Sequence, residues 1–232
     1  MKIKHVYTIC LVVLIPLTIF IQSYYLKNRF KQYTVNPACP WCEESGGRQD
    51  VVYLPLDVTI VRLFAPADPH FIADMLWLRT VYYFGKHALS DRQYPYLFHM
   101  LDLITDLSPQ WIHPYHYASV LLPTEADAVE DGMYILEKGL VHHPGDWRLW
   151  FFKGFYLWQN YGDTIGGARA LHQASIQPGA PIYLARLSAT LATREGEKEL
   201  AEHFLHNALK HIKDPEQRRL LYEKLREVSG AQ

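Results

Sequence analysis

The sequence is poor in cysteine and has no excess of either charge. Three cysteines in 232 residues are too few for a small fold held together by disulfides. Lysine and arginine total 23 against 24 acidic residues, a net charge of -1, so the chain lacks the basic surface that a general nucleic-acid-binding protein needs. Apolar residues are not scarce: they make up 49% of the chain, which excludes wholesale disorder.

Motifs of common catalytic sites are also missing. The sequence has no glycine-rich phosphate loop, no GxSxG elbow and no paired-carboxylate signature. Its 12 histidines include two pairs at a spacing of three residues, His113 with His116 and His203 with His206. No carboxylate completes an HExxH-like pattern, so we expect solvated or hydrogen-bonded histidines. The sequence therefore favours a non-enzymatic protein without a cofactor or a metal ion.

The first 31 residues contain no acidic residue and form a predicted membrane anchor. Residues 6–26 form a run of about 21 uncharged residues, close to the ~20 that a helix needs to cross a bilayer. Basic residues flank the run, and Tyr24 and Tyr25 stand where an interfacial aromatic belt would lie. We expect residues 1–31 to form a single-pass anchor in the inner membrane.

Two alternatives to an uncleaved anchor are weaker. A signal peptide would need a cleavage site with small residues, but Ile21-Gln22-Ser23 leads into two tyrosines. A lipoprotein would need a small residue before Cys10, where Ile9 stands. The basic flanks are nearly balanced, so orientation depends on the short N-terminal tail, which favours a soluble domain on the periplasmic side.

Residues 32–55 are predicted to be a tether that carries one local motif of chemical interest. The segment has three prolines and a Gly-Gly pair, and it contains Cys39-Pro40-Trp41-Cys42. Such a pair can form a disulfide, act as a redox pair or supply half of a zinc site. Redox or metal chemistry at Cys39 and Cys42 is thus the alternative function, which thiol titration and metal analysis would detect.

From residue 56 onward the pattern is helical and repeats. Prolines follow helix-like apolar runs at positions 109, 144, 178 and 215, at separations of 35, 34 and 37 residues. Periods of this size are typical of stacked helix pairs. With each second helix ending before the proline, units begin near Leu78, His113, Trp147 and Pro181. The eighth positions are then Gly85, Val120, Gly154 and Ser188, where the two helices of a pair should approach closely.

Helix-capping residues agree with these units. Asp68, Asp146 and Asp214 stand where helices should begin, and residues 214–228 predict an amphipathic last helix. The segment 147–180 has Trp150, Gly154 and Pro178 at the positions where tetratricopeptide repeats prefer these residue types. Residues 78–215 therefore resemble the tetratricopeptide repeat family. The segments LWLRTVYYFG and YPYLFHMLDLITDLSP also resemble membrane-anchored bacterial tetratricopeptide proteins of unassigned activity.

The resemblance implies an all-α, right-handed solenoid of about four helix pairs in residues 56–232, whose first helices line a concave groove. Tyr82, Tyr117 and Phe151 recur at separations of 35 and 34 residues, so they would stack as a ladder there. The alternative is that half of the groove candidates are interhelix core. The predicted partner-binding residues are Arg79, Tyr82, Lys86, Tyr117, Arg148, Phe151, Phe155 and Trp158. We expect a membrane-anchored scaffold that binds a protein or peptide in this groove, as part of a cell-envelope assembly.

Overall fold

The computed structural model describes residues 16–17, 57–64 and 68–230. Its contacts divide the chain into two units, Met1–Gln49 and Asp50–Gln232, and the fold below is that of the second unit. In the described part of the chain, no helix is both long enough and apolar enough to cross a membrane. The predicted anchor at residues 6–26, apart from positions 16 and 17, lies outside the described residues. Cys39 and Cys42 lie outside them too.

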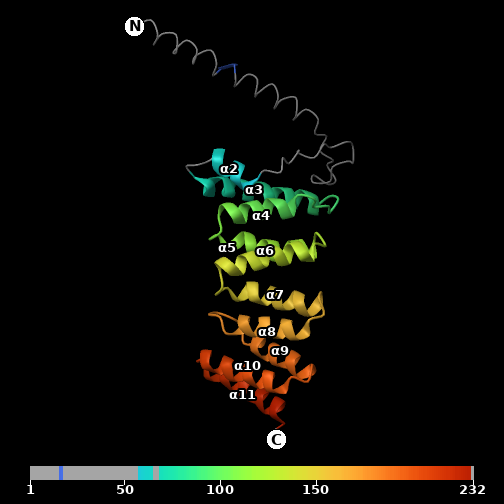
Figure 1. Ribbon diagram of the computed structural model, residues 1–232, viewed down its shortest axis with the longest axis vertical. Coiled ribbons are helices and arrows are strands. Elements are labelled where there is room, and N and C mark those ends of the chain that lie inside the picture. The colour runs from blue at the N-terminus through green and yellow to red at the C-terminus, as the bar shows by residue number, and fades with distance from the viewer. Residues whose placement is uncertain (1–15, 18–56, 65–67, 231–232) are drawn as a thin grey trace, which may run out of the picture. The chain divides into compact units, whose positions relative to one another are not determined.

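The second unit is all-α, as predicted, and its helices form antiparallel pairs along the chain (Figure 1). A short helix, α2 (Val58–Phe64), precedes the pairs, and α11 (Pro215–Ser229) follows them. The pairs are α3 (Pro69–Ala88) with α4 (Leu97–Leu107), α5 (Ile112–Thr124) with α6 (Val129–His142), α7 (Trp147–Gln159) with α8 (Thr164–Ser175), and α9 (Tyr183–Arg194) with α10 (Lys198–His211). From α3 onward each helix packs on the next, and α2 packs on α4, so the domain is an array built mainly from sequential contacts.

Local sequence signals set the ends of these helices. The carboxylate of Asp68 accepts a hydrogen bond from the Phe71 N–H, that of Asp146 accepts from the Leu149 N–H, and that of Asp214 accepts from the Gln217 N–H. These bonds satisfy N–H groups that have no partner within the first turn of a helix. The helices α4, α6, α8 and α10 all end before the four prolines of the repeat. The predicted caps and the predicted last helix are confirmed.

Gly154 lies where α7 and α8 touch, as its position in the repeat predicted. A Cβ atom at this residue would lie 2.8 Å from the Leu171 Cγ and 2.9 Å from the Gly167 carbonyl oxygen. Gly167 faces it in the same way, since a Cβ there would lie 2.9 Å from the Gly154 carbonyl oxygen. Two glycines thus let the helix backbones of this pair approach more closely than any side chain would allow.

The predicted start of the first pair, near Leu78, is wrong. Helix α3 begins at Pro69, behind the Asp68 cap, and runs for 20 residues, so Leu78 lies in its middle. Gly85 consequently does not lie at a helix contact: a Cβ there would meet no atom within 4 Å. Val120, the equivalent residue in α5, is 37% exposed. The repeat period was read correctly from the prolines, but it does not fix the length of the first helix.

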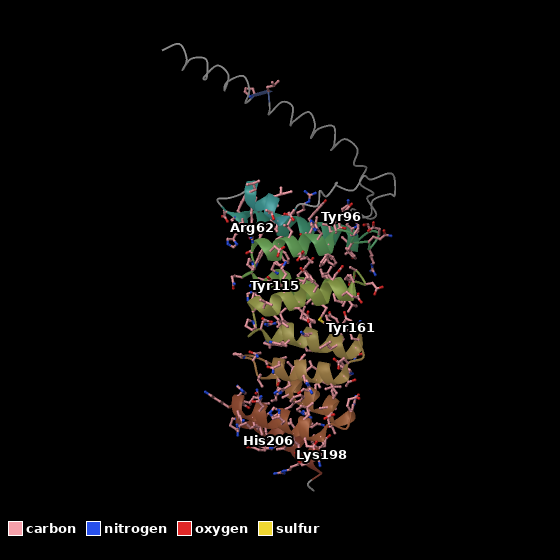
Figure 2. The ribbon with its side chains drawn as sticks, viewed as in Figure 1. Arg62, Tyr96, Tyr115, Tyr161, Lys198 and His206 are labelled. Atoms are coloured by element: carbon pink, nitrogen blue, oxygen red, sulfur yellow. The ribbon has the colours of Figure 1, made fainter. Side chains whose placement is uncertain are left out.

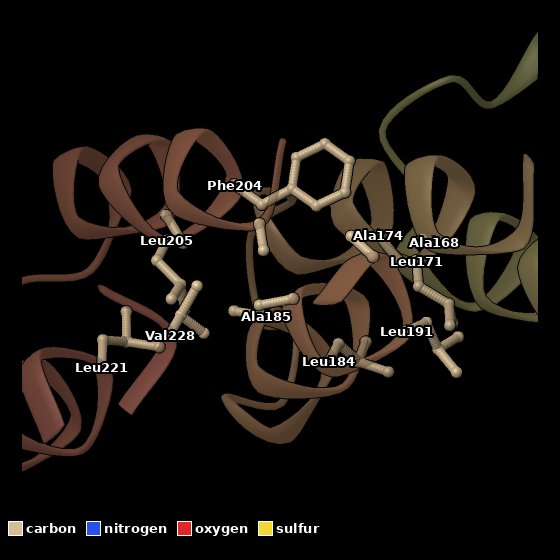
Figure 3. Close-up of a cluster of buried hydrophobic side chains, with 14 of the residues drawn as sticks. Ala168, Leu171, Ala174, Leu184, Ala185, Leu191, Phe204, Leu205, Leu221 and Val228 are labelled. Carbon is tan, nitrogen blue, oxygen red and sulfur yellow. The ribbon is translucent and has the colours of Figure 1, made fainter. Parts of the chain in front are cut away.

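The core runs through the array as a series of small and branched side chains. Around α8 to α11, alanines alternate with larger residues, as Leu171, Phe204 and Leu221 illustrate (Figure 3). Around α5, the largest fully buried residue is Tyr115 (Figure 2), whose hydroxyl donates to the Pro109 carbonyl oxygen at 3.2 Å. Gly139 makes room for this ring, because a Cβ there would lie 2.8 Å from the Tyr115 Cδ1.

Candidate functional site

An apolar hollow of about 560 Å³ lies between α3 and α5, the first helices of the first two pairs. Three aromatic rings form it: Trp77 meets Trp111 edge-on at 5.3 Å between ring centroids and meets Tyr117 at 5.0 Å. We call it the α3/α5 hollow, and its lining residues are Trp77, Trp111, His113, His116, Tyr117, Val120 and Leu121. Edge-on packing fixes the rings relative to one another, so the hollow presents a preformed aromatic surface.

Polar groups at the rim of the hollow are held by hydrogen bonds. His116 Nε2 lies 3.0 Å from the Oδ1 of Asp146, the residue that caps α7. Burial alone would raise the pKa of the Asp146 carboxyl, but bonds from His116 and from the Leu149 and Arg148 N–H groups outweigh it and lower that pKa. Asp146 therefore ties the rim of the hollow to the first turn of α7.

Tyr117 is the predicted site residue that the structure places in the hollow. Burial, with a smaller effect from Tyr94, raises the pKa of Tyr117 to about 12, so the side chain stays neutral at physiological pH. Its ring packs against Trp77 and, at 5.8 Å, against Phe84. The predicted ladder expects Tyr82, rather than Trp77 or Phe84, to pack against Tyr117. The structure instead places Trp77 and Phe84, one above the other on α3, against Tyr117.

Tyr82 and its predicted neighbours lie on another side of α3. At 100° per residue, Tyr82 projects about 140° away from Trp77, and Arg79 and Lys86 lie on the side of Tyr82. The Tyr82 side chain is 72% exposed. The structure thus groups these three residues with each other, but it does not bring them to the hollow.

The residues predicted in α7 divide into exposed and packed side chains. Arg148 is exposed, with its guanidinium 4.7 Å from the centre of the Trp147 ring. Phe155 is 39% exposed and lies 6.2 Å from Phe151, ring centre to ring centre. Trp158 packs against the core cluster of α8 to α11, and its Cβ lies where Gly167 leaves space. Arg148 and Phe155 are therefore accessible to a partner, whereas Trp158 contributes to interhelix packing.

The first helices of the second, third and fourth pairs carry no negative charge. Helices α5, α7 and α9 contain no aspartate or glutamate, and α7 and α9 carry Arg148, Lys153, Arg186 and Arg194. Acids lie on the second helices α4, α6 and α10 instead, and Asp102 and Asp106 of α4 both lie 2.6 Å from the Lys138 ammonium of α6. Helices α5, α7 and α9 thus combine aromatic side chains with an absence of acids, and α7 and α9 add positive charge, whereas α3 carries the exposed Asp74.

Sequence reasoning missed Trp77 and Trp111, which are two of the three aromatic rings that form the hollow. Both precede the unit starts that the prolines suggested. A signal was nevertheless present, because the two tryptophans stand 34 residues apart, which is the period of the repeat. A search for aromatic residues at that period, independent of the proline register, would have paired them.

A second hollow, of about 500 Å³, lies over α7, α8 and α10. One lining residue, His172, is 3% exposed, stacks on Phe204 at 4.3 Å and accepts a hydrogen bond from the Asn207 amide on Nε2. Burial, then His203 and His211, lowers the pKa of His172 to about 4. Its Nδ1 is buried and has no hydrogen-bond partner in the part of the chain that the structure describes. This neutral histidine serves packing between the third and fourth pairs.

The described residues contain no cluster of three side chains that could hold a metal ion. The redox or metal hypothesis for Cys39 and Cys42 concerns positions outside those residues and stays a prediction. Comparison of the chain with protein-family models gives no match, and comparison with curated proteins gives no similar sequence.

Proposed function

We propose that this chain is a membrane-anchored scaffold of the tetratricopeptide type, with a right-handed solenoid that binds a protein segment along its first helices. The observation that carries the proposal is the combination of preformed aromatic rings between α3 and α5 with first helices that are free of acids from α5 onward, of which α7 and α9 are basic. Rigid aromatic side chains supply much of the energy of protein interfaces. Positive charge nearby favours a partner with acidic residues beside its apolar anchors.

The anchor at residues 6–26 would hold the scaffold at the inner membrane, with the solenoid on the periplasmic side. Support for this part comes from the uncharged run and its basic flanks. A scaffold fixed to a membrane meets its partners at high effective concentration, so moderate affinity for a short segment is sufficient. The hollow is of a size that suits one or two large side chains of such a segment.

The test is a direct binding measurement with designed peptides. One peptide carries two leucines and a tryptophan flanked by glutamates, and its matched control carries lysines in place of the glutamates. We expect the acidic peptide to bind at least tenfold more tightly at low salt, and to lose affinity as salt rises. Arg148→Glu combined with Arg186→Glu should remove this preference, whereas Arg219→Glu in α11 should not.

A photoreactive side chain at Val120 maps the contact in cells. Val120 lines the hollow and is 37% exposed, and Val141 of α6, which is 77% exposed and outside the hollow, is the matched control. We expect defined cross-linked products from position 120 and not from position 141. Equal binding of the two peptides, together with no product specific to position 120, would overturn the proposal.

A further inference from the structure

Helix α3 has an exposed apolar face on the side away from its buried residues. Ala73, Thr80 and His87 form the buried side. On the other side lie large apolar residues that are 52% to 72% exposed, namely Phe71, Met75, Leu78, Tyr82 and, just after the helix, Leu89. Exposed apolar side chains scattered singly are ordinary, but five on one helix face form a continuous patch.

The spacing of these residues follows a coiled-coil seam. Together with Gly85 they recur at alternating intervals of four and three residues from position 71 to position 89. Steps of four and three keep side chains on one narrow line and are typical of a helix that packs against another helix. We call this set the α3 stripe. A helix that only contacted solvent would have no reason to carry such a line of large apolar residues.

The α3 stripe is also complementary to itself when it is reversed. Positions at equal distances from residue 80 form three layers: Phe71 with Leu89, Leu78 with Tyr82, and Met75 with Gly85. In the third layer the long methionine faces a residue without a side chain, and a Cβ at Gly85 would meet nothing within 4 Å. This symmetry is what an antiparallel pair of identical helices requires, because a twofold axis brings each position opposite its mirror position.

We propose that two copies of this chain associate through antiparallel packing of their α3 stripes, with the twofold axis at the level of residue 80. The five large side chains of each copy would bury an area on the order of 1,000 Å² in total, near the lower limit for a stable, specific interface. Arg79 and Lys86 also lie beside this face, as they would on a helix that binds anionic lipid, but a lipid surface would not require the mirror symmetry of the stripe. Asp74, which is exposed, stands one residue before Met75 and would be repelled by anionic lipid.

Cysteine cross-linking in the full-length chain tests the geometry directly. Cys10, Cys39 and Cys42 are first replaced by serine, and copies with two different affinity tags are co-expressed. We expect Leu78→Cys in one copy to form a disulfide with Tyr82→Cys in the other. The matched control pairs Leu78→Cys with Val141→Cys, which is 77% exposed on α6, and should give no product. Equal cross-linking in both pairs would refute the proposal.

The mass of the full-length chain in detergent gives the second measurement. We expect a dimer that becomes a monomer in the Leu78→Glu, Tyr82→Glu variant, with an unchanged helical signal and cooperative melting, because both positions are exposed in the single chain. A monomeric parent chain would refute the proposal, and binding of that monomer to anionic vesicles through the same residues would make lipid the occupant. A dimer that persists in the double variant would refute the α3 interface and indicate another contact.

Discussion

The hydroxyl of Tyr156 in α7 donates a hydrogen bond to the Ser119 carbonyl oxygen in α5, at 2.5 Å. In a regular helix this carbonyl would accept from the N–H of residue 123, but position 123 is a proline inside α5 and has no N–H. The tyrosine of the next pair thus satisfies the buried acceptor that the proline leaves open. Burial raises the pKa of Tyr156 to about 12, so the donor keeps its proton.

Replacement of Tyr156 by phenylalanine should therefore destabilise the domain. The ring stays, but a buried carbonyl loses its partner, which costs about 1–3 kcal/mol. Chemical denaturation of the parent and the variant measures this loss. We expect a lower midpoint with an unchanged slope, since the surface exposed on unfolding does not change.

The control is a double-mutant cycle with Pro123→Ala. An alanine restores the N–H that can bond to the Ser119 carbonyl oxygen, so Tyr156→Phe should cost less in the Pro123→Ala background than in the parent. A coupling energy of about 0.5 kcal/mol or more would support the link between the two residues. Strictly additive effects would contradict it, and Tyr156 would then stabilise the domain through its ring alone.

Gly154→Ala is the second predicted destabilising change, and Gly85→Ala is its matched control. Both glycines lie inside helices, so alanine gains up to about 1 kcal/mol of helix propensity at each. At Gly154 the new methyl group would lie within 3 Å of backbone atoms in α8, which forces the two helices apart. We expect a lower melting temperature for Gly154→Ala and an equal or higher one for Gly85→Ala. The reverse order would show that α7 and α8 do not meet at this glycine.

The stability of the domain should fall between pH 7 and pH 5 because of His172. Its pKa is about 4 in the folded state and close to 6.5 when the chain unfolds, so the unfolded state binds the proton first. The contribution of His172 to the free energy of unfolding is largest above pH 6.5, declines as the pH falls and is lost below pH 4. The difference between the folded and unfolded pKa values of His172 corresponds to about 3 kcal/mol of stability.

Melting temperatures at pH 7, 6 and 5 check this effect, with His172→Gln as the control. Glutamine does not titrate, so its curve should be flatter than that of the parent over the same range. Asp91 and Asp146, whose pKa values are lowered, lose their contributions only at more acidic pH. Parallel curves for the parent and His172→Gln would assign the decline to other groups.

Sequence patterns predicted the array well because its signals are local. Prolines after helices, aspartate caps and the small residue at Gly154 each depend on their neighbours in the chain, and each was confirmed. The start of α3 was missed because no proline stands one repeat period before Pro109. The prolines, and not the Asp68 cap, determined where the first predicted unit begins. The repeat period alone does not show which face of α3 meets α5, so the sequence predicted Tyr82 at the place that Trp77 occupies. The Tyr156 to Ser119 bond joins residues 37 apart, and no local pattern indicates it.

The last prediction concerns Phe155 and Trp158. The sequence placed both on one face of α7, but the structure exposes part of Phe155 and packs Trp158 on the core. Phe155 is 39% exposed and its ring contacts Phe151 and Tyr156, so Phe155→Ala should lower the free energy of unfolding less than Trp158→Ala does, while it weakens binding of the acidic peptide by about tenfold or more. Trp158 fills the space beside Gly167 and packs on the core, so Trp158→Ala should lower the free energy of unfolding by roughly 2–4 kcal/mol. Denaturation and peptide titration on each single variant distinguish the two roles. Loss of stability in Phe155→Ala with unchanged peptide affinity would show that its ring belongs to the core, and the binding face would then have to lie closer to the α3/α5 hollow.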